Sequence, residues 1–124
     1  MPARYALHPE AGFVEEVLEG EVALAELREV LAELFADPGW DPGFDGLVDL
    51  SAGRLHLSHV EVGAIAQQLS ADRSASRGRW AFVLGDPVNH GIVRMFASMS
   101  ENPPREVRIF PDRRGAVEWL VSRR

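Results

Sequence analysis

Polar side chains that suit a small-molecule site follow two apolar segments of this 124-residue chain. Gly46–Leu50 and Trp80–Leu84 are too short for helices and are typical of buried strands. Ligands of open parallel α/β sheets bind outside the carboxyl ends of the strands, so the polar residues that follow these segments are candidates for ligand binding. The candidate ligand-binding residues are Ser51, Asp86, Asn89 and His90.

The residues around Asp86 support two interpretations. Asp86 is a good N-cap, and Pro87 suits the first position of a helix, where a missing N–H costs nothing. The free N–H groups at such a helix start also attract anions. A capping aspartate, however, occupies these N–H groups and repels anions. A ligand site and a stable folding element are therefore both open interpretations of this segment.

A metal site is suggested by two histidines and then rejected on spacing. His56 and His59 lie three residues apart beside Glu61. Zinc proteases place two histidines on one helical face with a glutamate between them, and this spacing differs from theirs. The chain has no cysteine, which excludes disulfides, thiolate catalysis and cysteine-ligated metals. We therefore expect no metal and no other cofactor.

A hydrolase would have to combine a serine with a histidine. The available pairs are Ser51 or Ser58 with His56 or His90, and each pair needs its hydroxyl within hydrogen-bond reach of an imidazole. The chain contains no GxSxG, Walker, dinucleotide-binding or HExxH motif. The sequence therefore favours a protein without catalytic activity.

Two groups of polar residues have simple structural interpretations. Ser58, with Glu61 three residues later, forms the capping-box pattern of a helix start. A local acidic run is interpreted as a solvated strand end followed by a solvated helix start, because charge runs usually lie in water. The members of this run are Glu15, Glu16, Glu19 and Glu21.

The hydrophobic pattern predicts strands that alternate with helices. The predicted strands are Arg4–Glu10, Phe13–Leu18, Gly46–Leu50, Trp80–Leu84 and a final strand around Val107–Phe110. The predicted helices are Val22–Ala36, a helix from Ser58 through Leu69, Pro87–Met99 and Arg113–Ser122. The last two helices have the expected apolar stripes Ile92, Met95, Phe96 and Met99, and Ala116, Val117 and Leu120, with Trp119 as a flank.

This order of elements predicts one α/β domain over residues 1–124. Short connections and right-handed crossovers make the last four strands parallel, and the N-terminal strand becomes an antiparallel edge. The expected fold is a mostly parallel five-stranded sheet with four main helices. Arg54–Leu57 is expected to be a loop, and the edge strand Arg4–Glu10 leaves homodimerisation open.

The composition limits the partners and the location of the protein. A net charge of −6, with arginines scattered along the chain, argues against binding to a nucleic-acid backbone. No apolar run approaches the roughly 20 residues that span a bilayer. The N-terminus lacks the apolar region of a signal peptide. We therefore expect a cytoplasmic protein without a membrane span.

Four stretches cover nearly the whole chain and together resemble the SpoIIAA-like proteins. The stretches are VLEGEVALAELREVLAELF, FDGLVDLSA, WAFVLGDPVNHGIVRMFASM and REVRIFPDRRGAVEWL. SpoIIAA-like proteins belong to the superfamily of STAS domains (sulfate transporter and anti-sigma factor antagonist) and CRAL-TRIO lipid-binding domains. The resemblance implies a right-handed β-α superhelix, which agrees with the element order.

The resemblance also implies a phosphorylation candidate. In anti-sigma factor antagonists, a partner kinase phosphorylates a serine at the start of the helix after the central strand, usually within Asp-Ser-Ser/Thr-Gly. This serine corresponds to Ser58 when no gap is introduced. Leu57, His59 and Val60 depart from the usual neighbours, so the kinase-recognition context is missing. An ordinary N-cap explains Ser58 equally well.

Two functions follow from these observations. The first is a non-enzymatic regulatory or protein-interaction module, which contacts its partner through the strand-end loops and the helix near Ser58. The alternative is a small-molecule or lipid carrier, with a pocket at the strand ends or between helices and sheet. Residues suited to line such a pocket, or simply to pack the core and anchor a loop, are Trp40, Phe44, Met95, Phe96 and Met99.

Overall fold

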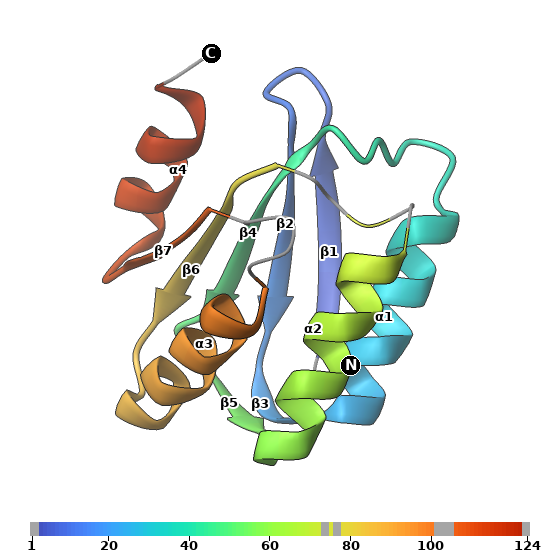
Figure 1. Ribbon diagram of the computed structural model, residues 1–124. Coiled ribbons are helices and arrows are strands. Elements are labelled where there is room, and N and C mark those ends of the chain that lie inside the picture. Colours follow the sequence, from blue (N-terminus) through green and yellow to red (C-terminus); the bar gives the residue numbers. More distant parts are fainter. Residues whose placement is uncertain (1–2, 73–74, 76–77, 101–105, 123–124) are drawn as a thin grey trace.

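The computed structural model describes residues 3–72, 75, 78–100 and 106–122. In this part of the chain, strands alternate with helices (Figure 1). The strands are β1 (Ala3–His8), β2 (Phe13–Leu18), β3 (Gly20–Ala23), β4 (Asp45–Leu50), β5 (Gly53–His56), β6 (Trp80–Leu84) and β7 (Val107–Phe110). The helices are α1 (Leu24–Ala36), α2 (His59–Ala71), α3 (Pro87–Met99) and α4 (Arg113–Val121).

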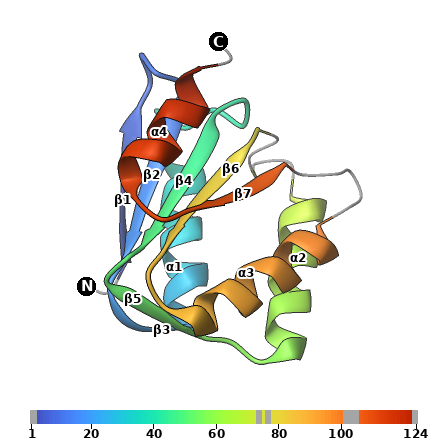
Figure 2. The same ribbon diagram turned by 90° about the vertical axis from the view of Figure 1, so that its left-hand side faces the viewer.

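The main sheet has five strands in the order β1-β2-β4-β6-β7. β1 is antiparallel to β2, and β2, β4, β6 and β7 are parallel to one another. The predicted mostly parallel sheet with an antiparallel N-terminal edge is therefore confirmed. Helices α1, α2 and α3 lie on one face of the sheet, and α4 lies on the other (Figure 2).

Each face of the sheet has its own core, because successive side chains of a strand point to opposite faces. The strand residues that face α1, α2 and α3 are Val14, Leu18, Val48, Leu50, Trp80, Phe82 and Leu84. The core on the other face consists of Phe13, Leu47, Ala81 and Val83 together with Ala116, Trp119 and Leu120 of α4. The predicted burial of Ala116 and Leu120 is confirmed.

Two short strands that the sequence analysis did not predict form a separate parallel pair. β3 pairs with β5, and this register places Val22 opposite Leu55. Both side chains are buried. The expected loop at Arg54–Leu57 is therefore wrong, and α1 begins at Leu24 rather than at Val22. Strands of four residues are too short to show a clear alternation in the sequence.

The buried face of helix α3 differs from the apolar stripe that the sequence predicts. Its buried side chains are Asn89 and Val93, one helical turn apart. Ile92 and Phe96 are partly buried against the same core. Met99, by contrast, is 37% exposed. The predicted stripe is wrong at Met99, because the buried face of α3 runs through Asn89 and Val93 and leaves Met99 at its exposed end.

Trp119 of α4 is buried, so its assignment as a flank is wrong. The side chain is only 8% exposed, and its ring lies 5.6 Å from that of Phe110. The guanidinium carbons of Arg79 and Arg108 lie 4.8 and 5.1 Å from the centroid of the indole. Two cation–π contacts and the burial of a large ring fix α4 on the sheet.

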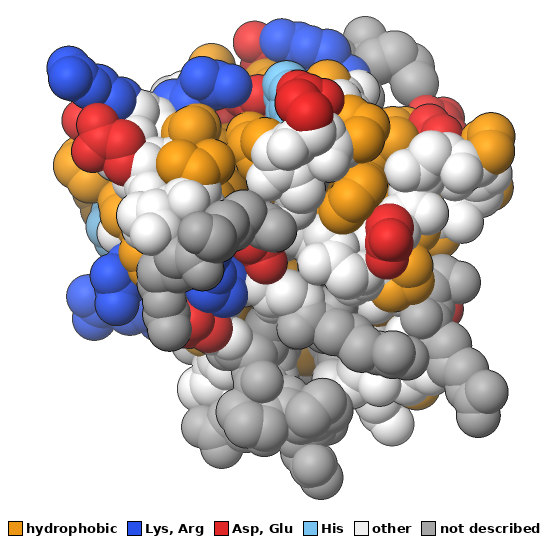
Figure 3. Space-filling view, turned by 90° about the horizontal axis from the view of Figure 1, so that it is seen from above, with side chains coloured by type: hydrophobic (Ala, Val, Ile, Leu, Met, Phe, Trp, Pro, Cys, Tyr) orange, Lys and Arg blue, Asp and Glu red, His pale blue; other side chains and the backbone are white. Residues whose placement is uncertain are grey.

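Charges of both signs are spread over the end of the molecule from which the parallel strands start. Seen from this end, acidic and arginine side chains of the described residues are interspersed with hydrophobic ones (Figure 3). Within the described part of the chain, none of the helices has the length and apolar character needed to cross a membrane.

The predicted capping box at the start of α2 is confirmed. The Ser58 hydroxyl oxygen accepts a hydrogen bond from the Glu61 N–H at 3.1 Å. In return, the Glu61 carboxylate accepts one from the Ser58 N–H at 2.8 Å. These two bonds satisfy N–H groups that have no partner within the helix.

Ser58→Ala should lower the free energy of unfolding by about 1 kcal/mol, because alanine cannot accept the capping hydrogen bond. Urea denaturation of the variant and the wild type measures this difference. Ser58→Asp is the matched control, since aspartate is an equally good N-cap and should preserve stability. Equal losses in both variants would contradict a capping role.

Candidate functional site

Two of the four predicted ligand-binding residues line an open depression at the carboxyl ends of the parallel strands. The depression has a volume of about 490 Å³ and is bordered by the residues 20–21, 51–54 and 85–87. The Ser51 hydroxyl donates a hydrogen bond to Asp49 Oδ1 at 2.6 Å. Asp86 Oδ1 accepts from the Val88 N–H at 2.8 Å, so Asp86 is the N-cap of α3 as predicted. Arg54 lies 3.7 Å from Asp86 across the depression.

Asn89 has a different position from the one predicted. Its side chain is fully buried, and its oxygen accepts a hydrogen bond from the Leu55 N–H at 3.0 Å. Its amide nitrogen donates to the Gly53 carbonyl at 2.9 Å. The side chain therefore ties α3 to β5. His90 is half-buried and does not border the depression.

In the described structure, no hydrogen bond joins either of the predicted serines, Ser51 and Ser58, to His56 or His90. His56 contacts the carboxylate of Glu21 across the β3–β5 pair, and His59 is exposed. The hydroxyl of Ser58 bonds within its own capping box, and that of Ser51 bonds to Asp49. Among the described residues, no group of three metal-ligating side chains is found.

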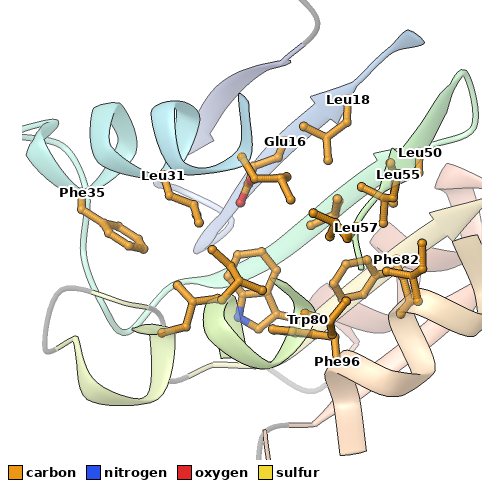
Figure 4. Close-up of a pocket in the computed structure, with 17 residues that line it drawn as sticks. Glu16, Leu18, Leu31, Phe35, Leu50, Leu55, Leu57, Trp80, Phe82 and Phe96 are labelled. Carbon is orange, nitrogen blue, oxygen red and sulfur yellow. The ribbon is translucent and has the colours of Figure 1, made fainter. Parts of the chain in front are cut away.

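A second, apolar cavity lies between the sheet and helices α1, α2 and α3. Its volume is about 90 Å³, and 17 residues line it (Figure 4). Fifteen of them contribute only hydrocarbon, from β2, β4, β5, β6, the segment before α2 and the three helices. The other two, Glu16 and Trp80, carry polar atoms. This cavity is therefore the apolar type of site that small ligands prefer, with few polar groups.

Glu16 and Trp80 each direct an unpartnered polar atom into a buried position. Glu16 is only 3% exposed, and Trp80 is 7% exposed. In the described structure, Glu16 Oε2 and Trp80 Nε1 are buried and have no hydrogen-bond partner. Figure 4 shows the Glu16 carboxyl group directed from β2 toward the region where the Trp80 indole lies. Unpartnered buried polar atoms are rare in native proteins and call for an explanation.

The interpretation of the acidic run as solvated is wrong for Glu16. Its side chain lies on the same face of β2 as Val14 and Leu18, which belong to the core. The alternation of Val14, Glu16 and Leu18 is visible in the sequence and predicts an inward-facing carboxyl group. Charge composition alone does not reveal this alternation, so it wrongly suggests that Glu16 is solvated.

Neighbouring carboxyl groups on β2 have opposite environments. Glu15 lies on the α4 face, where Arg113 donates to it at 2.6 and 2.8 Å and His8 Nε2 lies at 3.2 Å. The Arg113 guanidinium holds the pKa of Glu15 below its ordinary value. Burial alone, without an opposing charge, raises the pKa of Glu16 from 4.5 to about 7. The Glu16 carboxyl group therefore titrates near neutral pH.

The indole of Trp80 has its position because a glycine lies beside it. The β4–β6 register pairs Gly46 with Trp80. A Cβ atom on Gly46 would lie 2.3 Å from Cζ3 of the Trp80 ring, far inside contact distance. Glycine at this position therefore allows the ring to lie across β4 and to form one wall of the cavity.

Of the five residues expected to line a pocket, only Phe96 borders this cavity. The ring of Trp40 instead packs 5.6 Å from Phe35 and 5.9 Å from Phe44, so Trp40 anchors its loop onto the core. Met99 faces Gly63 of α2. The cavity lies between helices and sheet, but α1, α2 and the strands provide most of its walls.

The fold is similar to that of a solved structure of an uncharacterised protein. It is the crystal structure of an uncharacterised protein from the DUF3478 family with a SpoIIAA-like fold, from Shewanella loihica PV-4. The TM-score is 0.63 at 16% identity, and the match covers 95% of this chain and 91% of the other. No family model matches the chain, and no curated protein does. The SpoIIAA-like fold implied by the sequence resemblance is confirmed.

Asn89→Ala should lower the free energy of unfolding by about 2–4 kcal/mol, because the Leu55 N–H and the Gly53 carbonyl lose their buried partner. Denaturant unfolding measures the loss. His90→Ala is the control on the same helical turn and should change stability little, since His90 is only half-buried. A stable Asn89→Ala variant would contradict the structural role of this amide.

Glu16→Gln should flatten the pH dependence of stability between about pH 4.5 and pH 7. In the wild type, the unfolded chain releases the Glu16 proton above about pH 4.5, whereas the folded protein keeps it up to about pH 7. Stability therefore falls as pH rises through this window. The difference amounts to about 3 kcal/mol above pH 7.

Chemical denaturation of both proteins at pH 4, 6 and 8 tests this prediction. The variant should match the wild type at pH 4 and exceed it at pH 8. Parallel pH profiles would show that Glu16 ionises normally in the folded protein. The Glu15–Arg113 pair is present in both proteins and cancels in the comparison.

Proposed function

We propose that this protein is a small-molecule-binding module whose ligand occupies the cavity between the sheet and helices α1, α2 and α3. The observation that carries the proposal is a pair of buried polar atoms without a protein partner, Glu16 Oε2 and Trp80 Nε1, on two residues that border a cavity otherwise lined by hydrocarbon. A core that serves only for packing gains nothing from these groups. A binding site gains orientation and specificity from them.

The energetic cost of two buried polar atoms without a protein partner supports this proposal. A buried donor or acceptor without a partner costs about 1–3 kcal/mol, and Glu16 and Trp80 each contribute one. Replacing Glu16 by a leucine or methionine would remove its cost without opening a new cavity. A ligand that satisfies both polar atoms would recover the cost and stabilise the folded protein.

The arrangement of the helices supports a cavity that can take up a ligand. Of the three helices on this face of the sheet, α1 and α3 contact the strands, whereas α2 packs chiefly against α3. Three side chains of α2, Val62, Ile65 and Leu69, border the cavity from the outer side. The wall farthest from the sheet is therefore a helix that few strand contacts hold in place.

The regulatory or protein-interaction module is the second candidate, supported by two exposed valines. Val60 is 78% exposed on the first turn of α2, and Val88 is 46% exposed on the first turn of α3. Both helices start at the same end of the molecule, near the β3–β5 pair (Figure 1). Affinity capture with the wild type and with Val60→Asp tests this candidate. A partner that only the wild type retains would support it, and failure of the wild type to retain a specific partner would contradict it.

Leu31→Phe should abolish ligand binding, because Leu31 projects from α1 into the cavity and a phenyl ring would fill the space (Figure 4). Leu31→Ala is the opposite change. It should enlarge the cavity and lower stability by about 2–4 kcal/mol, part of which an added ligand should restore. Mass spectrometry of organic extracts from freshly purified protein, followed by thermal shifts with phenol and toluene, measures binding.

A compound that is extracted from the wild type and not from Leu31→Phe supports the proposed function. Thermal stabilisation of the wild type and the Leu31→Ala variant by either added compound, without an effect on Leu31→Phe, also supports it. The proposal fails if the wild type yields no compound and neither added molecule changes its unfolding temperature.

A further inference from the structure

Building on the proposed function, we infer that the ligand is a small uncharged alcohol or phenol, whose hydroxyl group binds Glu16 and Trp80 together while its hydrocarbon part contacts the apolar walls. The inference follows from the hydrogen-bonding capacity of the two groups. The indole N–H of Trp80 can only donate, and a carboxyl oxygen of Glu16 can accept. One hydroxyl group offers both an acceptor and a donor, so a single ligand atom can satisfy both side chains.

Charged ligands fit the cavity less well than neutral ones. Among the described residues that line the cavity, Glu16 is the one ionisable residue, and none is an arginine or a histidine. An anion would meet no positive charge and would be repelled by an ionised Glu16. An ammonium group could pair with Glu16, but it has no acceptor for the N–H of Trp80. Burying a charge without full compensation is costly, so an uncharged polar group is favoured.

Water alone satisfies the site poorly. About 10–15 Å³ is enough for one water molecule, so a cavity of about 90 Å³ has room for several. A buried water usually makes about three hydrogen bonds, and the described residues around this cavity offer only the Glu16 carboxyl group and one indole N–H as side-chain partners. The other walls are hydrocarbon, and an apolar molecular body contacts them better than water does.

The volume of the cavity limits the size of the ligand. A cavity of about 150 Å³ with similar apolar walls can hold benzene. The present cavity, of about 90 Å³, is of the same order and suits a molecule of a single ring or smaller. Long-chain lipids therefore exceed the volume that this cavity provides.

Phenol and toluene provide the test, because they have nearly the same shape and differ in the hydroxyl group. The readout is the ¹H–¹⁵N signal of the Trp80 indole, assigned by its loss in Trp80→Phe. Toluene is the more apolar molecule, so burial alone would favour it. The inference expects the opposite order, with phenol binding at least about tenfold more tightly and shifting the indole signal through a new hydrogen bond.

Two variants make the result specific to Glu16. Glu16→Leu removes the acceptor and should reverse the preference, so that toluene binds more tightly than phenol. Glu16→Gln preserves the shape and an amide oxygen, and should keep the preference for phenol. It also provides the comparison if the leucine variant does not fold.

The outcomes separate this inference from the proposed function. If toluene binds the wild type as tightly as phenol, or if the preference persists in Glu16→Leu, the hydroxyl inference is wrong and the binding function stands. If neither molecule binds and no compound is extracted from the protein, both fail. A preference for phenol that depends on Glu16 supports both.

Discussion

Side-chain alternation along β2, in a sheet that helices cover on both faces, is the constraint on which the candidate site depends. It directs Glu15 toward α4 and Glu16 toward α1, α2 and α3. On the α4 face, Arg113 neutralises the carboxylate. On the other face the carboxyl group meets hydrocarbon and one indole. Two adjacent residues of the same type therefore differ in charge state near neutral pH, because the sheet separates their surroundings.

The cavity itself results from how three helices share one face of the sheet. α1 and α3 pack on strands, whereas α2 packs chiefly on α3 and leaves space beneath it. The indole of Trp80 partly fills this space because Gly46 on the neighbouring strand lets the ring lie flat. A side chain at Gly46 would clash with the Trp80 ring and would displace its buried indole N–H.

The fold could be predicted from the sequence because its strands and helices carry strong periodic signals. Trp80–Leu84, buried throughout, and the caps Ser58 and Asp86 were recognisable without coordinates. The candidate site was harder to predict from the sequence than the fold. Glu16 belongs to an acidic run, which suggests a solvated side chain, but its alternation with the core residues Val14 and Leu18 indicates that it faces inward. The role of Asn89 could not be predicted, since its backbone partners belong to β5, a strand too short to recognise.

The β3–β5 pair has a mechanical consequence. β3 leads directly into α1, and β5 lies just before α2, so main-chain hydrogen bonds join the bases of the two helices. Asn89 extends this joint to the first turn of α3. All three helices that enclose the cavity therefore begin next to the β3–β5 pair and are linked to it by the chain or by hydrogen bonds. A tilt of α2 relative to the β3–β5 pair would widen the cavity, with the largest displacement at the end of α2 far from this pair.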